Sequence, residues 1–464
     1  MENFRCKILS LDFHHLKNTN HGHIDFLSID DFLHNEEGNP NVFGIYGQNG
    51  SGKSTAILAL AILQTLFQER PLGEDVGFSI SGWSEDADVS LSLAFELSGR
   101  PFMCDYSVRI KKQPNGSFAI DQETLSSKYY EGRWLKYAPT YSVGQSLDPG
   151  TIFGSDTNLK SLAHSLLVDT AKSLGSSLVT KRSVIFDPAL RNAIASKKNP
   201  ESAKLCQLVG NLSNWAVGSF IVSSVVDQGC IETLGLLPLR IRHQDQTGGL
   251  TGAIPINLFE QNSIPAELFK NVQEALNQFN IVVPAFLPNA KIRIRVIDDA
   301  NKAQPGKTAF ELMSLVNGYE IPLRNESDGT KRIISLCSSL FACYGDDAVV
   351  MVVDEFDAGI FEYLFGEIIE VLSKGAAGQL VFTSHNLRPL EVLAPSSLIL
   401  TTTDPENRYE FFKGLKTSNN PRDVYLRNAF LHHDDDHFYQ PTNEYDITKA
   451  FMKIGDLYHG NNNA

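Results

Sequence analysis

The stretch Gly47-Gln48-Asn49-Gly50-Ser51-Gly52-Lys53-Ser54-Thr55 fits the pattern of a phosphate-binding loop: a glycine, four residues, then Gly-Lys-Ser. The apolar run from Val42 to Tyr46 predicts a buried strand before it, and Ala56 to Phe67 predicts an apolar helix after it. Glycines let successive backbone N–H groups turn toward phosphate oxygens, and a helix start adds positive potential. The stretch therefore predicts a nucleotide-binding strand–loop–helix unit.

Each residue of this loop has an expected part in holding ATP and Mg²⁺. Lys53 is expected to reach the β- and γ-phosphates, and the Ser54 hydroxyl to ligate Mg²⁺. The other residues are expected to surround the phosphates with backbone and hydroxyl groups; they are Gly47, Asn49, Gly50, Ser51, Gly52 and Thr55.

A second motif follows far along the chain. Val349 to Val353 is a purely apolar run that ends in Asp354 and Glu355, which is the Walker B arrangement. Asp354 is expected to hold Mg²⁺ directly or through water, and Glu355 to act as general base toward the attacking water. Asp357 follows at the position of a dimer-contact loop.

Two further segments frame this motif. Ser327 stands where a helix cap belongs, and Gly329 would let the backbone approach an anion closely. The strand predicted from Gln379 ends at His385, which is expected to bond the γ-phosphate or the attacking water. Each interval between Ser327, Asp354 and His385 holds one helix and one strand, as a parallel sheet requires.

Together these motifs resemble the ATP-binding-cassette superfamily, and more closely the bacterial AAA15 and OLD-like ATPases related to RecF, SMC and Rad50 heads. The segment Ser327-Asp-Gly-Thr-Lys-Arg332 is typical of the signature of the AAA15 group, many of which act in abortive phage defence. The resemblance implies head-to-tail pairs, in which Ser327 and Gly329 of one copy act on the γ-phosphate held by the other. ATP binding would close the pair and hydrolysis would reopen it.

The chain also departs from its relatives. The segment between Lys53 and Ser327 is too long for a transporter ATPase and too short for an SMC or Rad50 arm, and no Leu-Ser-Gly-Gly-Gln signature is present. The residues after His385 are too few for the TOPRIM nuclease of OLD proteins. A GTPase is disfavoured because Asn301-Lys302-Ala303-Gln304 ends in the wrong residue for reading guanine.

We expect an α/β fold: a cassette-type ATPase head with an antiparallel subdomain and a mainly helical insertion. The expected parts are an N-terminal lobe (1–147), the insertion (148–280), a C-terminal lobe (281–415) and a tail (416–464). Strands are predicted for Phe4 to Phe13 and its return partner Gly22 to Phe26, for Val89 to Leu97, and for Lys291 to Val296. Helices are predicted around Leu159, over Leu205 to Leu212, over Ala266 to Phe279, and over Tyr445 to Tyr458.

Composition narrows the class of protein. The chain has 464 residues, 42% hydrophobic and 20% charged, as is ordinary for a soluble globular protein. No signal-peptide pattern opens it and no apolar run is long enough to span a bilayer, so we expect a cytoplasmic protein without a membrane partner. The six cysteines form no Cys-x-x-Cys pair, which disfavours a zinc or disulfide framework. A net charge of −14 favours a protein partner over DNA.

Several polar clusters are expected to be solvated surface. They are the histidines at 14, 15, 21 and 23, read as a loop; the basic pairs Lys181-Arg182, Lys197-Lys198, and Arg240 with Arg242; and the segment Ala429 to His437 in the tail. A metal cluster is the alternative for the histidines, and nucleic-acid contact for the basic pairs.

The expected function is an ATP-dependent sensor in phage defence that controls a separate toxic effector. The size and single-head layout are similar to the ATPase subunits of PARIS systems, which partner a TOPRIM nuclease, and of Septu systems, which partner an HNH nuclease. A homo-oligomer and a phage-encoded trigger would follow. The alternatives are a RecF-like ATPase acting on DNA in repair and a transporter ATPase.

Overall fold

The computed structural model describes residues 4–34, 40–144, 181–195, 200–224, 236–245, 248–257, 260–288, 290–297, 306–412, 420–430 and 443–458. At its centre lies a six-stranded sheet in the order β18-β17-β3-β16-β15-β8, parallel except for β18 at one edge. Its strands are β3 (Val42–Tyr46), β8 (Phe220–Ser223), β15 (Val350–Val353), β16 (Gln379–Thr383), β17 (Leu398–Thr401) and β18 (Tyr409–Phe411).

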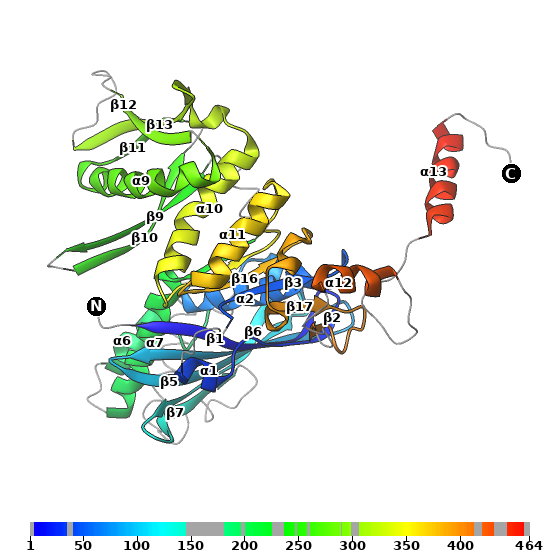
Figure 1. Ribbon diagram of the computed structural model, residues 1–464. Helices are drawn as coiled ribbons and strands as arrows, with labels where there is room; N and C mark the ends of the chain where they lie inside the picture. Colours follow the sequence, from blue (N-terminus) through cyan, green and yellow to red (C-terminus); the bar gives the residue numbers. More distant parts are fainter. Residues whose placement is uncertain are drawn as a thin grey trace.

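Both faces of this sheet are covered, and β3, β15 and β16 are accordingly buried at every position rather than at alternate ones. On one face, Val350 and Val352 pack in a core that includes α2 (Lys53–Phe67) and α7 (Pro200–Gly218). On the other face, Met351 and Val353 pack in a core that includes α10 (Asp328–Gly345) and α11 (Glu362–Gly375). In Figure 1, α10 and α11 lie on one side of the sheet.

An antiparallel sheet of six strands, in the order β2-β1-β4-β5-β6-β7, shares the α2 core. The predicted pairing of Phe4 to Phe13 with Gly22 to Phe26 is confirmed, since β1 pairs with β2. The strand β5 pairs with β6 across Pro114-Asn115-Gly116. The strands are β1 (Arg5–Leu16), β2 (Thr19–Asp25), β4 (Asp86–Leu97), β5 (Arg100–Lys112), β6 (Phe118–Tyr130) and β7 (Trp134–Gly144). Short helices α1 (Ile29–His34) and α3 (Asp75–Phe78) join this part of the chain.

The region predicted to be a helical insertion (148–280) contains strands as well as helices. Among its described residues, α6 (Pro188–Ala195), α7 and α9 (Ala266–Phe286) are helical, while β9 (Leu236–Asp245) and β10 (Gly248–Asn257) form a hairpin. The strand β8 pairs in parallel with the Walker B strand β15, so this part of the region belongs to the central sheet. The helix expected around Leu159 lies outside the described residues.

A small antiparallel sheet follows, in which β13 lies between β11 and β12 and also pairs with β14. Its strands are β11 (Asn262–Pro265), β12 (Ala290–Val296), β13 (Lys307–Val316) and β14 (Tyr319–Pro322). The strand β12 is an edge strand, as its alternation of charged and apolar residues predicts. Its arginines are paired: Arg293 lies 3.1 Å from Glu320, and Arg295 lies 2.5 Å from Glu311.

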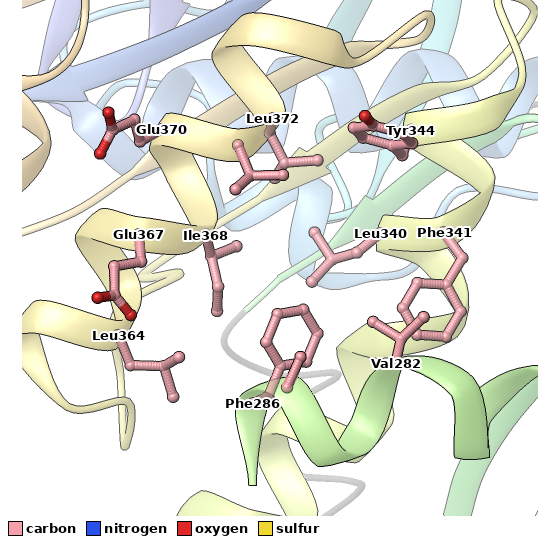
Figure 2. Close-up of a pocket in the computed structure, with 12 residues that line it drawn as sticks. Val282, Phe286, Leu340, Phe341, Tyr344, Leu364, Glu367, Ile368, Glu370 and Leu372 are labelled. Atoms are coloured by element: carbon pink, nitrogen blue, oxygen red, sulfur yellow. The ribbon is translucent and has the colours of Figure 1, made fainter. Parts of the chain in front are cut away.

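An apolar groove of about 650 Å³ lies between α9, α10 and α11. Figure 2 shows Phe286, Leu340, Phe341 and Ile368 around it, with Glu367 and Glu370 as the charged residues of its lining. The groove is therefore a second recessed surface, distinct from the phosphate loop.

The tail contains α12 (Pro421–Phe430) and α13 (Glu444–Tyr458), which confirms the predicted terminal helix. Figure 1 shows α13 as the last helix of the chain, and Ile447, Phe451 and Ile454 on it are exposed. The segment from Leu431 to His437 lies outside the described residues. Among the described residues, no helix combines the length and apolarity that crossing a membrane demands.

Candidate active site

The phosphate loop connects β3 to α2, as the motif predicts. Gly52 precedes α2 with φ +103°, and Gly50 has φ +79°, which are left-handed conformations that favour glycine. A Cβ atom at Gly47 would overlap the Thr401 hydroxyl on the neighbouring strand β17. Asn49 and Gly50 are exposed, whereas Ser51, Gly52 and Thr55 are buried. The glycines are thus required by backbone shape and by close packing.

Lys53 lies folded over its own loop. Its Nζ donates hydrogen bonds to the backbone oxygens of Gly47 at 2.7 Å and Gln48 at 2.9 Å. Burial lowers the pKa of this ammonium group, while the nearby carboxylates of Asp354 and Glu355 act in the opposite direction. The amine is therefore held at the concave side of the loop, where phosphate oxygens would replace the two carbonyls.

Parallel pairing brings the two predicted Mg²⁺ ligands together. The Ser54 hydroxyl donates to Asp354 Oδ1 at 3.2 Å, although 300 residues separate them in sequence. Hydroxyl and carboxylate oxygens are the hard donors that Mg²⁺ prefers. These residues fit a Mg²⁺ ion shared with the phosphates of a nucleotide, and the ion would neutralise charge on those phosphates.

Thr383 organises the carboxylates, and the sequence motifs did not single it out. Its hydroxyl donates to Asp354 Oδ1 at 2.6 Å and accepts a hydrogen bond from the Glu355 backbone N–H at 2.8 Å. Glu355 has φ +46°, a left-handed conformation that is uncommon for a residue other than glycine. Thr383 thus holds Asp354 in place and supports the unusual backbone at Glu355, a pattern that clusters at functional sites.

Residues of β17 and β18 contact the phosphate loop and support it. The Thr401 hydroxyl donates to the Tyr46 backbone oxygen at 3.1 Å and contacts the Ser51 hydroxyl. The Tyr409 hydroxyl donates to the Gly52 backbone oxygen at 2.6 Å. No local motif marks Thr401 or Tyr409, because only the strand order brings them beside the loop.

The predicted signature opens α10. Ser327 is the N-cap of this helix, and its hydroxyl accepts a hydrogen bond from the Thr330 backbone N–H at 3.1 Å. Ser327 and Asp328 are exposed. Gly329 packs so closely on the Gly359 carbonyl that a Cβ atom at this position would lie 2.5 Å from that oxygen. In this chain the glycine is therefore needed for contact with the loop after Walker B.

His385 follows β16 and is exposed. Its backbone N–H lies 3.3 Å from both carboxylate oxygens of Asp357, and the Asn386 N–H donates to Asp357 Oδ2 at 3.0 Å. Asp357 thereby ties the loop after Walker B to the loop that carries His385. The catalytic assignment of His385 itself stays a prediction.

Comparison with known proteins adds a family model and distant structures. Residues 246–391 match the model described as "AAA domain, putative AbiEii toxin, Type IV TA system". This range includes Ser327, Asp354, Glu355 and His385 but not the phosphate loop. No matching curated protein was found.

Solved structures that match the chain include an SMC head bound to the C-terminal winged-helix domain of ScpA. The sequence identity is 12% and the TM-score 0.40, and the match covers 87% of this chain and 97% of that one. The SMC head domain from Thermotoga maritima matches at 13% identity and TM-score 0.36, covering 88% and 100%. RecF in the RecFOR pathway matches at 14% identity and TM-score 0.33, covering 82% and 92%.

The family match and the geometry agree on a coarse assignment. The model match covers the Walker B half of the site, and the structure places the phosphate loop against that half through Ser54 and Asp354. Both features support an ATPase of the ABC/AAA type.

Proposed function

We propose that this protein binds and hydrolyses ATP and uses the reaction to control a separate toxic effector in phage defence. The observation that carries the ATPase part is the meeting of Ser54, Asp354 and Thr383, with the Glu355 backbone held by the same threonine. A metal ligand pair and a carboxylate base positioned by one strand end are what phosphoryl transfer to water needs.

The residues divide the reaction as follows. Lys53 and the loop amides hold the phosphates, while Ser54 and Asp354 would hold Mg²⁺. Glu355 takes a proton from the attacking water while the water oxygen forms a bond to the γ-phosphorus. The bond between the γ-phosphorus and the bridging oxygen breaks, and ADP leaves with that electron pair.

Pairing of two heads would complete the site. Ser327 and Asp328 are exposed at the start of α10, where backbone N–H groups point outward and favour an anion. This placement supports the expectation that Ser327 acts on ATP held by a second copy. Gly329 would serve this role indirectly, by letting the start of α10 pack on Gly359.

A protein partner is supported by the groove between α9, α10 and α11. Its lining is apolar apart from Glu367 and Glu370, as Figure 2 shows. Such a groove suits an amphipathic helix, and Glu367 favours a basic residue beside its apolar stripe, whereas Glu370 pairs with Lys374 at 2.6 Å. We assign this helix to the effector, a nuclease of the TOPRIM or HNH class. The family description names a putative toxin of a type IV toxin–antitoxin system, which supports a link to systems of that kind.

The regulator role can be tested by measuring the native mass of the purified protein in the presence of ATP, with and without the protein encoded beside it. A large complex containing that protein is expected. A dimer that does not bind the neighbouring protein, but binds DNA in a salt-dependent manner, would favour a RecF-like function. A phage trigger would be sought only after the complex is found.

A groove variant tests where the effector docks. Val371 lines the groove and is 58% exposed, whereas Ile281 on α9 is 79% exposed and outside the lining. Val371→Lys should weaken capture of the effector, and Ile281→Lys should leave it unchanged. Equal effects of the two variants would exclude the groove as the docking site.

A further inference from the structure

The four histidines predicted to lie in a loop all lie on the paired strands β1 and β2. In the antiparallel register Asp12 stands opposite His23, and His14 opposite His21. Residues two apart on a strand share a face, so these four side chains form one cluster on one face of the hairpin. His15 points elsewhere, where it contacts Ser84 and Asp86.

The donor atoms of this cluster converge. Asp12 Oδ2 lies 3.0 Å from His21 Nε2, and Asp12 Oδ1 lies 3.3 Å from His14 Nε2. One ligand atom from each of Asp12, His14 and His21 lies within 4.8 Å of the others. In a tetrahedral zinc site, bond lengths near 2.0–2.2 Å place donor atoms about 3.3 Å apart. The cluster therefore needs only small side-chain adjustments to close around one ion.

The remaining members support this arrangement. His23 Nδ1 lies 3.0 Å from Asp12 Oδ2, and its Nε2 lies 3.1 Å from Asp25 Oδ2. A histidine held between two carboxylates orients the carboxylate that would bind the ion. The side chains of Asp12, His14 and His21 are between 34% and 43% exposed, which leaves an ion a path from solvent.

We propose that Asp12, His14 and His21 bind one divalent transition-metal ion of the Zn²⁺ class, with His23 orienting Asp12. Two imidazoles and a carboxylate suit Zn²⁺, Co²⁺ or Ni²⁺, whereas Mg²⁺ prefers oxygen ligands and would go to Ser54 and Asp354. The fourth position is left to water. This site is separate from the ATP site in residues and in metal preference.

The ion would link the two strands of the hairpin whose turn contacts the phosphate loop. The turn between β1 and β2 carries Asn18, whose side-chain amide donates to the Gly50 backbone oxygen. Arg408 donates to the Asn18 backbone oxygen at 2.6 Å, fixing the same turn. Crosslinking β1 to β2 through an ion would therefore stabilise the support of the phosphate loop.

Equilibrium dialysis of the full, tag-free chain with Zn²⁺ in excess Mg²⁺ tests the proposal. One ion per chain should bind at this site, and His14→Ala or His21→Gln should each weaken binding by at least about tenfold. His34→Ala is the matched control, because His34 is exposed and its side chain bonds to the Asp30 backbone oxygen of its own helix. Its affinity should equal that of the unaltered protein.

A second readout does not depend on activity. Visible absorption of Co²⁺ should report a tetrahedral nitrogen and oxygen environment, and should be lost in His21→Gln. Zn²⁺ should raise the melting temperature of the unaltered protein and of His34→Ala, because ligand binding stabilises the folded state. It should not raise that of His14→Ala.

The tail offers a competing set of metal ligands, since its sequence contains His432, His433 and His437. Binding that survives His14→Ala and His21→Gln, but disappears when these three are replaced by alanine, would overturn the proposal. Failure to bind Zn²⁺ stoichiometrically would also overturn it.

Discussion

The phosphate loop and the start of α10 differ in how their polar groups are used. In the loop, Lys53 and Ser54 bond to groups of the same chain, and Ser51, Gly52 and Thr55 are buried. At the start of α10, Ser327 bonds within its own helix and stands exposed with Asp328. The first region is assembled by the sheet, whereas the second faces outward. The difference suits a site whose second half is supplied by another copy.

The largest expected effect comes from Glu355→Gln, in the Walker B motif beside the phosphate loop. The amide keeps the size of the side chain but cannot accept the proton, so turnover should fall by roughly 10²–10⁴-fold. ATP should stay bound, and native mass should show a persistent pair. Glu362→Gln, at an exposed position of α11, is the control and should hydrolyse normally. Normal turnover by Glu355→Gln would require another base.

Lys53→Ala should come next. Loss of the ammonium removes charge stabilisation at the phosphates, and the expected fall in turnover is about 10²–10³-fold. Phosphate release and binding of a fluorescent ATP analogue would measure it. Lys374→Ala removes an exposed lysine from α11 and should change neither. Unchanged turnover in Lys53→Ala would refute the active-site assignment.

Thr383→Val tests the support beneath the carboxylates. The change keeps the shape but removes the hydroxyl that bonds Asp354 and Glu355. We expect turnover to fall about 10–100-fold, as for other residues that orient metal ligands. Steady-state kinetics against Mg²⁺ concentration would show a higher Mg²⁺ requirement. Thr65→Val, which loses a bond inside α2, should retain both the rate and the Mg²⁺ dependence.

A mixing experiment tests the contrast itself. Lys53→Ala lacks the phosphate-binding amine and Ser327→Arg blocks the start of α10, so each alone should be inactive. An equal mixture should recover about a quarter of the unaltered rate, because half of the pairs are mixed and each mixed pair keeps one intact site of two. No recovery, with both variants folded and paired, would mean that one chain completes the site alone.

Much of this site could be predicted because its motifs are local. The loop and the Walker B run each combine their residues within one turn or strand end, so the letters indicate the geometry. Thr383, Thr401 and Tyr409 could not be found in this way, since only the strand order places them beside the loop. Pairing across distant segments is a tertiary property without a local signal.

Three other features of the fold could be found only from the structure. The sequence predicts the hairpin of β1 and β2 but assigns His14 and His21 to its connecting loop, because histidine has little preference for strands. The strand β8 has only four residues, too few for a clear period. Lys181 was expected to be solvated, but it is buried, pairs with Glu74 and lies 5.0 Å from the Phe118 ring centre. Its partners come from distant parts of the chain.

The position of β3 has a consequence for synthesis. This strand ends at Tyr46, yet its two neighbours in the sheet are β16 and β17, which begin at Gln379 and Leu398 and are therefore made much later. At ~5–20 residues per second, the phosphate loop waits on the order of tens of seconds for its supporting strands. A nascent or prematurely terminated chain therefore cannot form a working nucleotide site. Translation must therefore pass β17 (Leu398–Thr401) before the molecule can respond to ATP.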